Sequence, residues 1–226
     1  MIPQLTFTGV DEFTDMAALD KLLYGQEVGI LVTDSPDGRN RYPSEAWIEQ
    51  TIAEYKHHPI ALHICGVRAR TKLLSGYYKS WAIDVKRIQV NGVVTADDLH
   101  TICSLYPDQK IITQPGKPEN DPLVDLVVAD NNHCLLIDGS GGRGISPPEW
   151  KSPVATKNVG FAGGLGPDTI VSEFLKIEKI AKEGFWLDME GNLRTEDKFD
   201  ISKVKKVLSN LNEHEMRQNL VKWTKK

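Results

Sequence analysis

The sequence predicts a single (β/α)₈ barrel of parallel strands with an extra helix at its C-terminal end. Short apolar runs bounded by glycine or polar residues recur along the chain, as buried parallel strands require, and an amphipathic stretch follows each run. Eight such units fit into 226 residues with no apolar run left over. No linker divides the chain, so we expect one domain over residues 1–226, with residues 212–226 as a terminal helical extension.

The predicted elements follow this alternation in order. The strands are Leu5–Thr8, Val28–Thr33, Ile60–Cys65, Arg87–Val90, Lys110–Thr113, Cys134–Ile137, Val159–Ala162 and Phe185–Leu187. The helices are Thr14–Leu23, Ser44–Tyr55, Arg68–Tyr77, Ala96–Leu105, Pro122–Val128, a short segment near Trp150, Asp168–Ala181, Ile201–Leu211 and a further terminal helix over Glu213–Trp223. Eight alternating units could also form an open doubly wound sheet; the absence of a linker or second composition favours the closed barrel.

Composition narrows the function classes. A formal net charge of -4 gives no global attraction to nucleic acid or to an acidic membrane surface, and no stretch is long and apolar enough to span a membrane. Three widely spaced cysteines argue against a disulfide scaffold and for a reducing compartment, so we expect a cytoplasmic protein. We expect no cofactor and no metal, because no spacing of ligand residues supports a site.

Two glycine-rich segments end predicted strands. In the first, LLIDGSGGRG, an apolar strand ends in Asp138 and a flexible loop follows; in a barrel such strand ends project into the active site, although the loop could equally be a surface turn capped by Asp138. The second, FAGGLGPD, contains Gly163, Gly164 and Leu165 before a helix predicted to begin at Pro167. Glycine backbone and exposed helix N–H groups attract phosphate, and barrels often hold phosphate after strands seven and eight.

These segments, LLIDGSGGRGISPPEW and FAGGLGPDTI, resemble the signature of phosphoribosylanthranilate isomerase, a TIM-barrel enzyme of tryptophan synthesis. That family has a strand ending in Asp, a GG-x-G loop with a Trp soon after, and a strand running into A-G-G-L-x-P. LTFTG is similar in position to the family's K-I-C-G, GRNRYPSE to its basic loop, IQVNG to V-Q-L-H-G and WLDMEG to V-D-V-S-S-G. The resemblance spans the whole chain, most specifically at strands six and seven.

The resemblance implies an Amadori rearrangement of an aminoribose phosphate, in which an acid opens the sugar ring and a base removes the C2 proton. It assigns the acid to Asp138 and places Arg41 where the family binds the anthranilate carboxylate. The other residues that it implies for ligand or phosphate binding are Gly141, Gly142, Gly163, Gly164, Leu165, Asp188 and Gly191.

The sequence departs from the family at the base. Thr8 stands in place of the cysteine of K-I-C-G, and a threonine hydroxyl has no accessible thiolate-like form. Asn91 replaces a histidine, and Glu190-Gly191-Asn192 replaces the Ser-Ser-Gly turn. On the third strand, His63 and Cys65 are two residues apart and share a face; facing inward, they are alternative catalytic residues, and otherwise they are core residues.

The sequence therefore predicts an enzyme that performs isomerisation or related acid/base chemistry on a phosphorylated sugar. The alternative is a non-catalytic barrel that binds a phosphorylated ligand, since a fold alone does not determine function.

Overall fold

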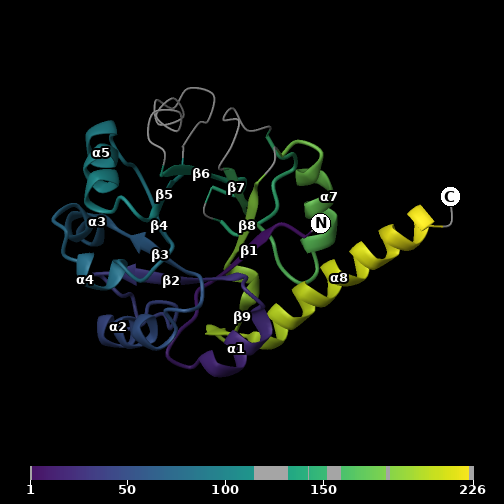
Figure 1. Ribbon diagram of the computed structural model, residues 1–226, viewed down its shortest axis with the longest axis horizontal. Helices are drawn as coiled ribbons and strands as arrows, with labels where there is room; N and C mark the ends of the chain where they lie inside the picture. Colours follow the sequence, from purple (N-terminus) through teal and green to yellow (C-terminus); the bar gives the residue numbers. More distant parts are fainter. Residues whose placement is uncertain (1, 115–131, 142, 152–158, 182–183, 224–226) are drawn as a thin grey trace.

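The eight predicted strands close into a barrel (Figure 1). The computed structural model describes residues 2–114, 132–141, 143–151, 159–181 and 184–223. The strands are β1 (Gln4–Thr8), β2 (Glu27–Thr33), β3 (Ile60–Cys65), β4 (Arg87–Val90), β5 (Lys110–Thr113), β6 (His133–Asp138), β7 (Val159–Ala162) and β8 (Trp186–Met189). All are parallel, and β8 pairs with β1, with Leu5 opposite Leu187. This closing pair rules out the open sheet and confirms the predicted fold class.

Helices surround the barrel. They are α1 (Met16–Leu23), α2 (Glu45–Glu54), α3 (Val67–Leu74), α4 (Lys79–Ala82), α5 (Ala96–Leu105), α7 (Ile170–Glu178) and α8 (Ile201–Trp223). The single helix predicted over Arg68–Tyr77 is wrong at its end, because Gly76 has a φ of 76° and turns the backbone between α3 and α4. The residues near Trp150 are not helical, and the helix predicted over Pro122–Val128 lies outside the described residues.

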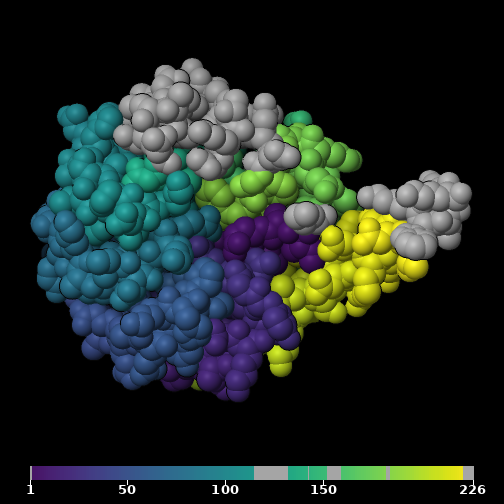
Figure 2. All heavy atoms as spheres, viewed as in Figure 1, coloured from purple at the N-terminus to yellow at the C-terminus, as the bar shows by residue number. Residues whose placement is uncertain are grey.

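The C-terminal part of the chain differs most from the prediction. The two helices predicted over Ile201–Leu211 and Glu213–Trp223 form one continuous helix, α8. Figure 1 shows its C-terminal half projecting from the barrel beyond α7, and Figure 2 shows the same projection. In the first half of α8, Val204, Val207 and Leu211 are buried, whereas Met216 and Leu220 in the second half are exposed. Packing against the barrel therefore explains only the first half of this helix.

A small hairpin between β8 and α8 was not predicted. It consists of the 3₁₀ turn η1 (Gly191–Leu193) and the two-residue strands β9 (Arg194–Thr195) and β10 (Lys198–Phe199). The buried Arg194 fastens it to the loop after β1, with hydrogen bonds to the carbonyl of Gly9 at 2.5 Å and to Asp11 Oδ2 at 2.7 Å. The hairpin thus joins the loops that follow the first and last strands.

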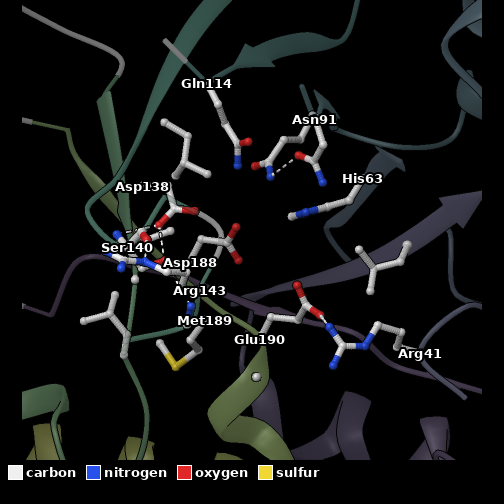
Figure 3. Close-up of a pocket in the computed structure, with 18 of the residues that line it drawn as sticks. Arg41, His63, Asn91, Gln114, Asp138, Ser140, Arg143, Asp188, Met189 and Glu190 are labelled. Carbon is white, nitrogen blue, oxygen red and sulfur yellow. Dashed lines mark hydrogen bonds and ion pairs between the residues drawn. The ribbon is translucent and has the colours of Figure 1, made fainter. Parts of the chain in front are cut away.

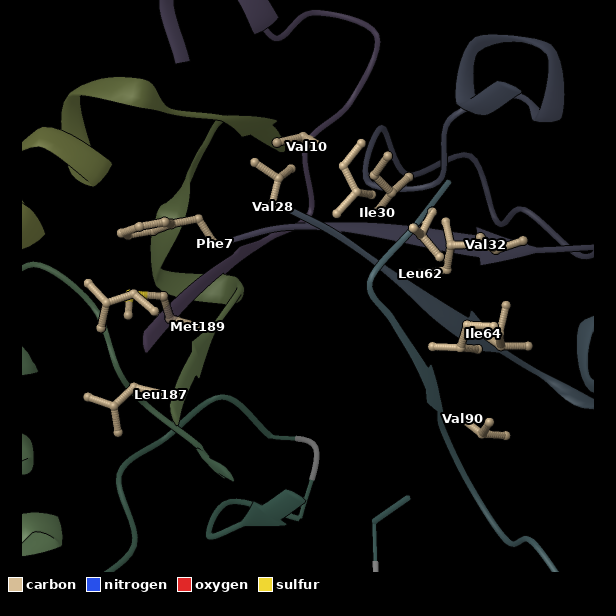
Figure 4. Close-up of a cluster of buried hydrophobic side chains, with 14 of the residues drawn as sticks. Phe7, Val10, Val28, Ile30, Val32, Leu62, Ile64, Val90, Leu187 and Met189 are labelled. Carbon is tan, nitrogen blue, oxygen red and sulfur yellow. The ribbon is translucent and has the colours of Figure 1, made fainter. Parts of the chain in front are cut away.

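Apolar residues on the outer face of the sheet form the main core. Outward-facing strand side chains such as Phe7, Ile30 and Leu62 (Figure 4) belong to one buried cluster. Helix residues such as Leu19 and Ile48 are part of the same cluster. Burial of these outward-facing apolar side chains against the helices provides the hydrophobic stabilisation that holds the barrel and its surrounding helices together.

The barrel interior contains one apolar cluster and one polar group. Ile112, Cys134, Leu136 and Trp186 form a separate buried apolar cluster inside the barrel. Gly160 leaves room for Trp186, because a Cβ at this position would come within 2.1 Å of the indole ring. A polar group that we call the floor, made of Thr6, Glu27 and Arg87, lies at the opposite end of the interior from the loops that follow the strands.

Candidate active site

A cavity of about 420 Å³ opens at the C-terminal ends of the strands. The predicted site residues that line it are Arg41, His63, Cys65, Asp138, Gly163, Gly164, Leu165, Asp188 and Gly191. Thr8 lies beneath it, buried, and contacts Asp188. Gly141 does not line this cavity, and Gly142 lies outside the described residues. In Figure 3 the polar ends of Asp138, Asp188 and His63 point toward the same space.

Asp138 ends β6 and is oriented by the loop that follows. Its Oδ1 accepts hydrogen bonds from the backbone N–H of Ser140 at 2.9 Å and from the Ser140 hydroxyl at 2.7 Å. Gly163, the residue after β7, approaches this pair so closely that a Cβ would come within 2.8 Å of the Ser140 nitrogen and 3.2 Å of Asp138 Oδ1. A glycine after β7 is therefore needed for the two loops to meet around the Asp138 carboxyl group.

Asp188 lies on β8, two strands from Asp138 and level with it, because Ala162 pairs with both residues. The Asp188 side chain is buried, and burial raises its pKa to about 7. The Thr8 hydroxyl opposes this rise by donating a hydrogen bond of 2.6 Å to Asp188 Oδ1. Asp188 is thus a carboxyl group that can gain or lose a proton near neutral pH, a property the sequence did not reveal.

His63 and Cys65 both face inward from β3, the orientation that their prediction as alternative catalytic residues required. Burial lowers the pKa of His63 to about 4 and raises the pKa of Cys65 to about 11, so the imidazole is neutral and the thiol protonated near pH 7. His63 Nε2 lies 3.4 Å from Thr8 Oγ1. Because the Thr8 hydroxyl donates to Asp188, it can accept a hydrogen bond from the imidazole N–H; the three side chains then form a chain.

The turn after β7 offers backbone donors to the cavity. Gly163 and Gly164 have φ values of 120° and 66°, and the carbonyls of Gly164 and Leu165 accept hydrogen bonds from Asn192 Nδ2 at 3.0 and 3.3 Å. Among the described residues, no acceptor binds the N–H groups of residues 163–165. Helix α7 begins at Ile170 rather than at Pro167, so the predicted helix start is wrong, and the donors belong to the glycine turn itself.

Arg41 is already paired within the protein. Its Nη1 donates to Glu190 Oε1 at 2.5 Å, across the cavity mouth from the loop after β2 to the turn after β8. Burial raises the pKa of Glu190, and the Arg41 guanidinium opposes that rise. The residue predicted to bind a ligand carboxylate therefore has a carboxylate of the protein beside it.

Several lining residues were not predicted as site residues. They are Gln89, Asn91, Gln114, Ser140, Arg143 and Asn192. Asn91 and Asn192 were noted only as departures from the family pattern, and Gln114 follows β5 without a motif. Within the described parts of the chain, no group of three His, Cys, Asp or Glu side chains could hold a metal ion. No described helix has the length and apolar character needed to cross a membrane.

The solved structures similar to this chain include three phosphoribosylanthranilate isomerases, whereas no protein-family model and no curated sequence matches the chain. Monomers generated from the dimeric phosphoribosylanthranilate isomerase of Thermotoga maritima share 16% identity at a TM-score of 0.62, over 93% of this chain and 98% of theirs. The N-(5'-phosphoribosyl)anthranilate isomerase of Pyrococcus furiosus shares 13% at 0.57, over 93% and 99%. The phosphoribosyl anthranilate isomerase of Thermococcus kodakaraensis shares 15% at 0.55, over 92% and 98%.

The chain has the fold of these isomerases. At these identities the likeness extends to the TIM barrel and its strand order, in agreement with the fold that the sequence resemblance implied.

Proposed function

We propose that this protein is an enzyme that catalyses an isomerisation, or a related proton transfer beside a carbonyl or imine, on a phosphorylated sugar. The observation that carries the proposal is the pair of carboxyl groups, Asp138 and Asp188, at one rim of the cavity. Such chemistry needs one group that donates a proton and one that accepts it, each with a pKa matched to the working pH.

In this proposal Asp188 is the base that the sequence lacked at Thr8. Burial raises its pKa to about 7, so the Asp188 carboxyl group can accept a proton near neutral pH. Oδ1 is held by Thr8, and Oδ2 accepts no hydrogen bond from the described residues, which leaves it for a ligand proton. Cys65 and His63 stay predictions as catalytic residues; burial disfavours the thiolate of the first and the protonated form of the second.

Asp138 is the acid in this proposal, and the turns after β7 and β8 bind the phosphate. The N–H groups of residues 163–165 and the side chain of Arg143 border the same cavity. Arg143 donates through Nε to the Ser140 carbonyl at 2.9 Å, which leaves its terminal nitrogens for an anion. Backbone N–H groups with an arginine beside them are a common way to bind a phosphate group.

Proton exchange with solvent tests the proposal independently of the identity of the product. The protein is incubated in D₂O with phosphorylated aldoses and N-substituted ribosylamine 5-phosphates, and NMR follows the replacement of the C2 proton by deuterium. We expect exchange with at least one phosphorylated compound and none with its unphosphorylated form. With N-(5'-phosphoribosyl)anthranilate itself we expect little or no turnover, because Thr8 stands where that substrate's cysteine base is needed and the proposed base, Asp188, lies on a different strand.

A thermal-shift titration with the same compounds distinguishes the alternative function. A phosphorylated sugar that raises Tm without exchanging its C2 proton supports a non-catalytic binding barrel. If no phosphorylated compound raises Tm or exchanges its proton, both functions are wrong.

A further inference from the structure

The two arginines in the loop after β2 have carboxylate partners. Arg41 is paired with Glu190 at 2.5 Å, and Arg39 forms an ion pair with Asp37. Both arginines line the cavity, and Figure 3 shows Arg41 on the side away from Ser140 and Arg143. Among the described residues, Arg143 is the cavity arginine that has no carboxylate partner. Positive charge for a ligand is therefore concentrated beside the turn after β7.

Uncharged amides line the part of the cavity formed by β4 and β5. Gln89 Nε2 donates to Asn91 Oδ1 at 3.0 Å, and Asn91 Nδ2 donates to Cys65 Sγ at 3.2 Å. Gln114, which follows β5, lies near them with its amide toward the cavity (Figure 3). A carboxamide can donate and accept hydrogen bonds without a net charge, which suits a ligand group that both donates and accepts hydrogen bonds.

Glu190 disfavours a negatively charged ligand group beside Arg41. Its side chain is about one-third exposed and borders the cavity beside Arg41. A ligand carboxylate at this position would compete with Glu190 for the guanidinium and would lie beside a second carboxylate. Two like charges in a partly enclosed site repel, and such repulsion is an effective way to reject a ligand.

We propose that the end of the ligand remote from its phosphate is an uncharged hydrogen-bonding group, such as a carboxamide or a hydroxyl, and that Glu190 excludes ligands with a carboxylate there. The inference rests on the proposed function, because it takes the phosphate at the turn after β7 as the anchor. It names the substrate class as a sugar phosphate with one anionic group and a neutral, polar substituent at the other end.

Three stable ligands that differ in one substituent test this selectivity. They are 1-deoxyribitol 5-phosphates that carry at C1 a 2-carbamoylphenylamino, a phenylamino or a 2-carboxyphenylamino group, with ribitol 5-phosphate as the reference. We expect the carbamoyl compound to bind tightest and the carboxyl compound to bind at least about tenfold more weakly than it, by calorimetry.

The variant Glu190→Gln separates the role of charge from that of shape. We expect it to tighten the carboxyl compound by at least about tenfold, because Arg41 is released, and to change the carbamoyl compound little. Glu196→Gln is the matched control: Glu196 is exposed in the β9–β10 turn, does not line the cavity and undergoes the same change of charge. Tm is measured for each variant, and Glu190→Ala serves as the second variant if the first is unfolded.

The possible outcomes distinguish a failure of this inference from a failure of the proposed function. If ribitol 5-phosphate binds but the wild-type protein prefers the carboxyl compound, or Glu190→Gln leaves the affinity for the carboxyl compound unchanged, the inference is overturned and the proposed function stands. If neither ribitol 5-phosphate nor any of the three ligands binds, the proposed function fails and the inference falls with it.

Discussion

The floor and the mouth of the barrel each hold a buried carboxyl group, and the two differ in their partners. Glu27, at the floor, accepts a bifurcated hydrogen bond from the single N–H of Arg87 Nε, at 2.9 and 2.7 Å, another from Arg87 Nη2, and one from Thr6 at 3.0 Å. Asp188, near the mouth, accepts one hydrogen bond from the described residues, from the neutral hydroxyl of Thr8. Arg87 also stacks over Trp186, with its Cζ 4.5 Å from the ring centroid, and so links the polar floor to the apolar cluster.

Because of this difference, one barrel interior supplies both stability and chemistry. A buried carboxylate with a guanidinium beside it has its charge balanced in place. A buried carboxyl group with only a hydroxyl partner has a raised pKa, and Asp188 therefore exchanges its proton near neutral pH. Substitutions of Glu27, Asp188 or their partners test this difference.

The largest effect is expected from Asp188→Asn. The amide can still accept the Thr8 hydrogen bond, but it cannot remove a proton, so C2 exchange should fall about 10²–10⁴-fold. The rate is measured by NMR in D₂O, with Asp108→Asn, the same change at an exposed turn, as the control. If Asp188→Asn exchanges the C2 proton at the wild-type rate, Asp188 is not the base, and His63 and Cys65 become the leading candidates.

At the floor, Arg87→Met should act on stability. It leaves Glu27 buried without its cation, which costs about 3–5 kcal/mol of unfolding free energy. Urea unfolding at pH 7 measures the loss. The double variant Arg87→Met with Glu27→Gln should recover part of it, because the unpaired charge is gone. A loss below about 1 kcal/mol in the single variant would mean that the floor pair contributes little.

The long-range pairs in this comparison explain what the sequence could not predict. Buried strands and the glycine turn after β7 follow from local patterns, and the strand predictions are confirmed within a residue or two. Arg87 and Glu27 are 60 residues apart, and Arg41 and Glu190 are 149 apart. Only barrel closure brings such residues together, so neither the floor pair nor the partner of Arg41 has a signal in the local sequence.

The structure of the C-terminal region could not be predicted from local patterns either. Asn212 has no helix-breaking character strong enough to end a helix, and the chain continues through it as α8. The β9–β10 hairpin depends on Arg194 reaching Asp11, 183 residues earlier. That contact, like the floor pair, is formed by the tertiary structure and is invisible to periodicity.

The pH dependence of stability should distinguish the two carboxyl groups. Asp188 has a folded-state pKa of about 7, above its ordinary value of 3.8, so between these pH values the folded protein holds a proton that the unfolded chain releases. Stability therefore falls as pH rises from about 4 to 7. Asp188→Asn removes this loss: its stability relative to wild type should rise by up to about 4 kcal/mol between pH 4 and pH 8. A pH-independent difference would contradict the raised pKa.

The smallest effect is expected from Thr8→Val, which keeps the shape of the side chain and removes the hydroxyl. That hydroxyl lowers the pKa of Asp188, so its loss should raise this pKa and move the rising limb of the pH–rate profile toward higher pH by about one pH unit. Exchange at pH 7 should then fall by up to about tenfold and recover at higher pH. Thr8→Ser keeps the donor and should leave the limb in place. An equal, pH-independent loss in both variants would instead assign Thr8 to packing, because only the removal of the hydrogen bond predicts a shift along the pH axis.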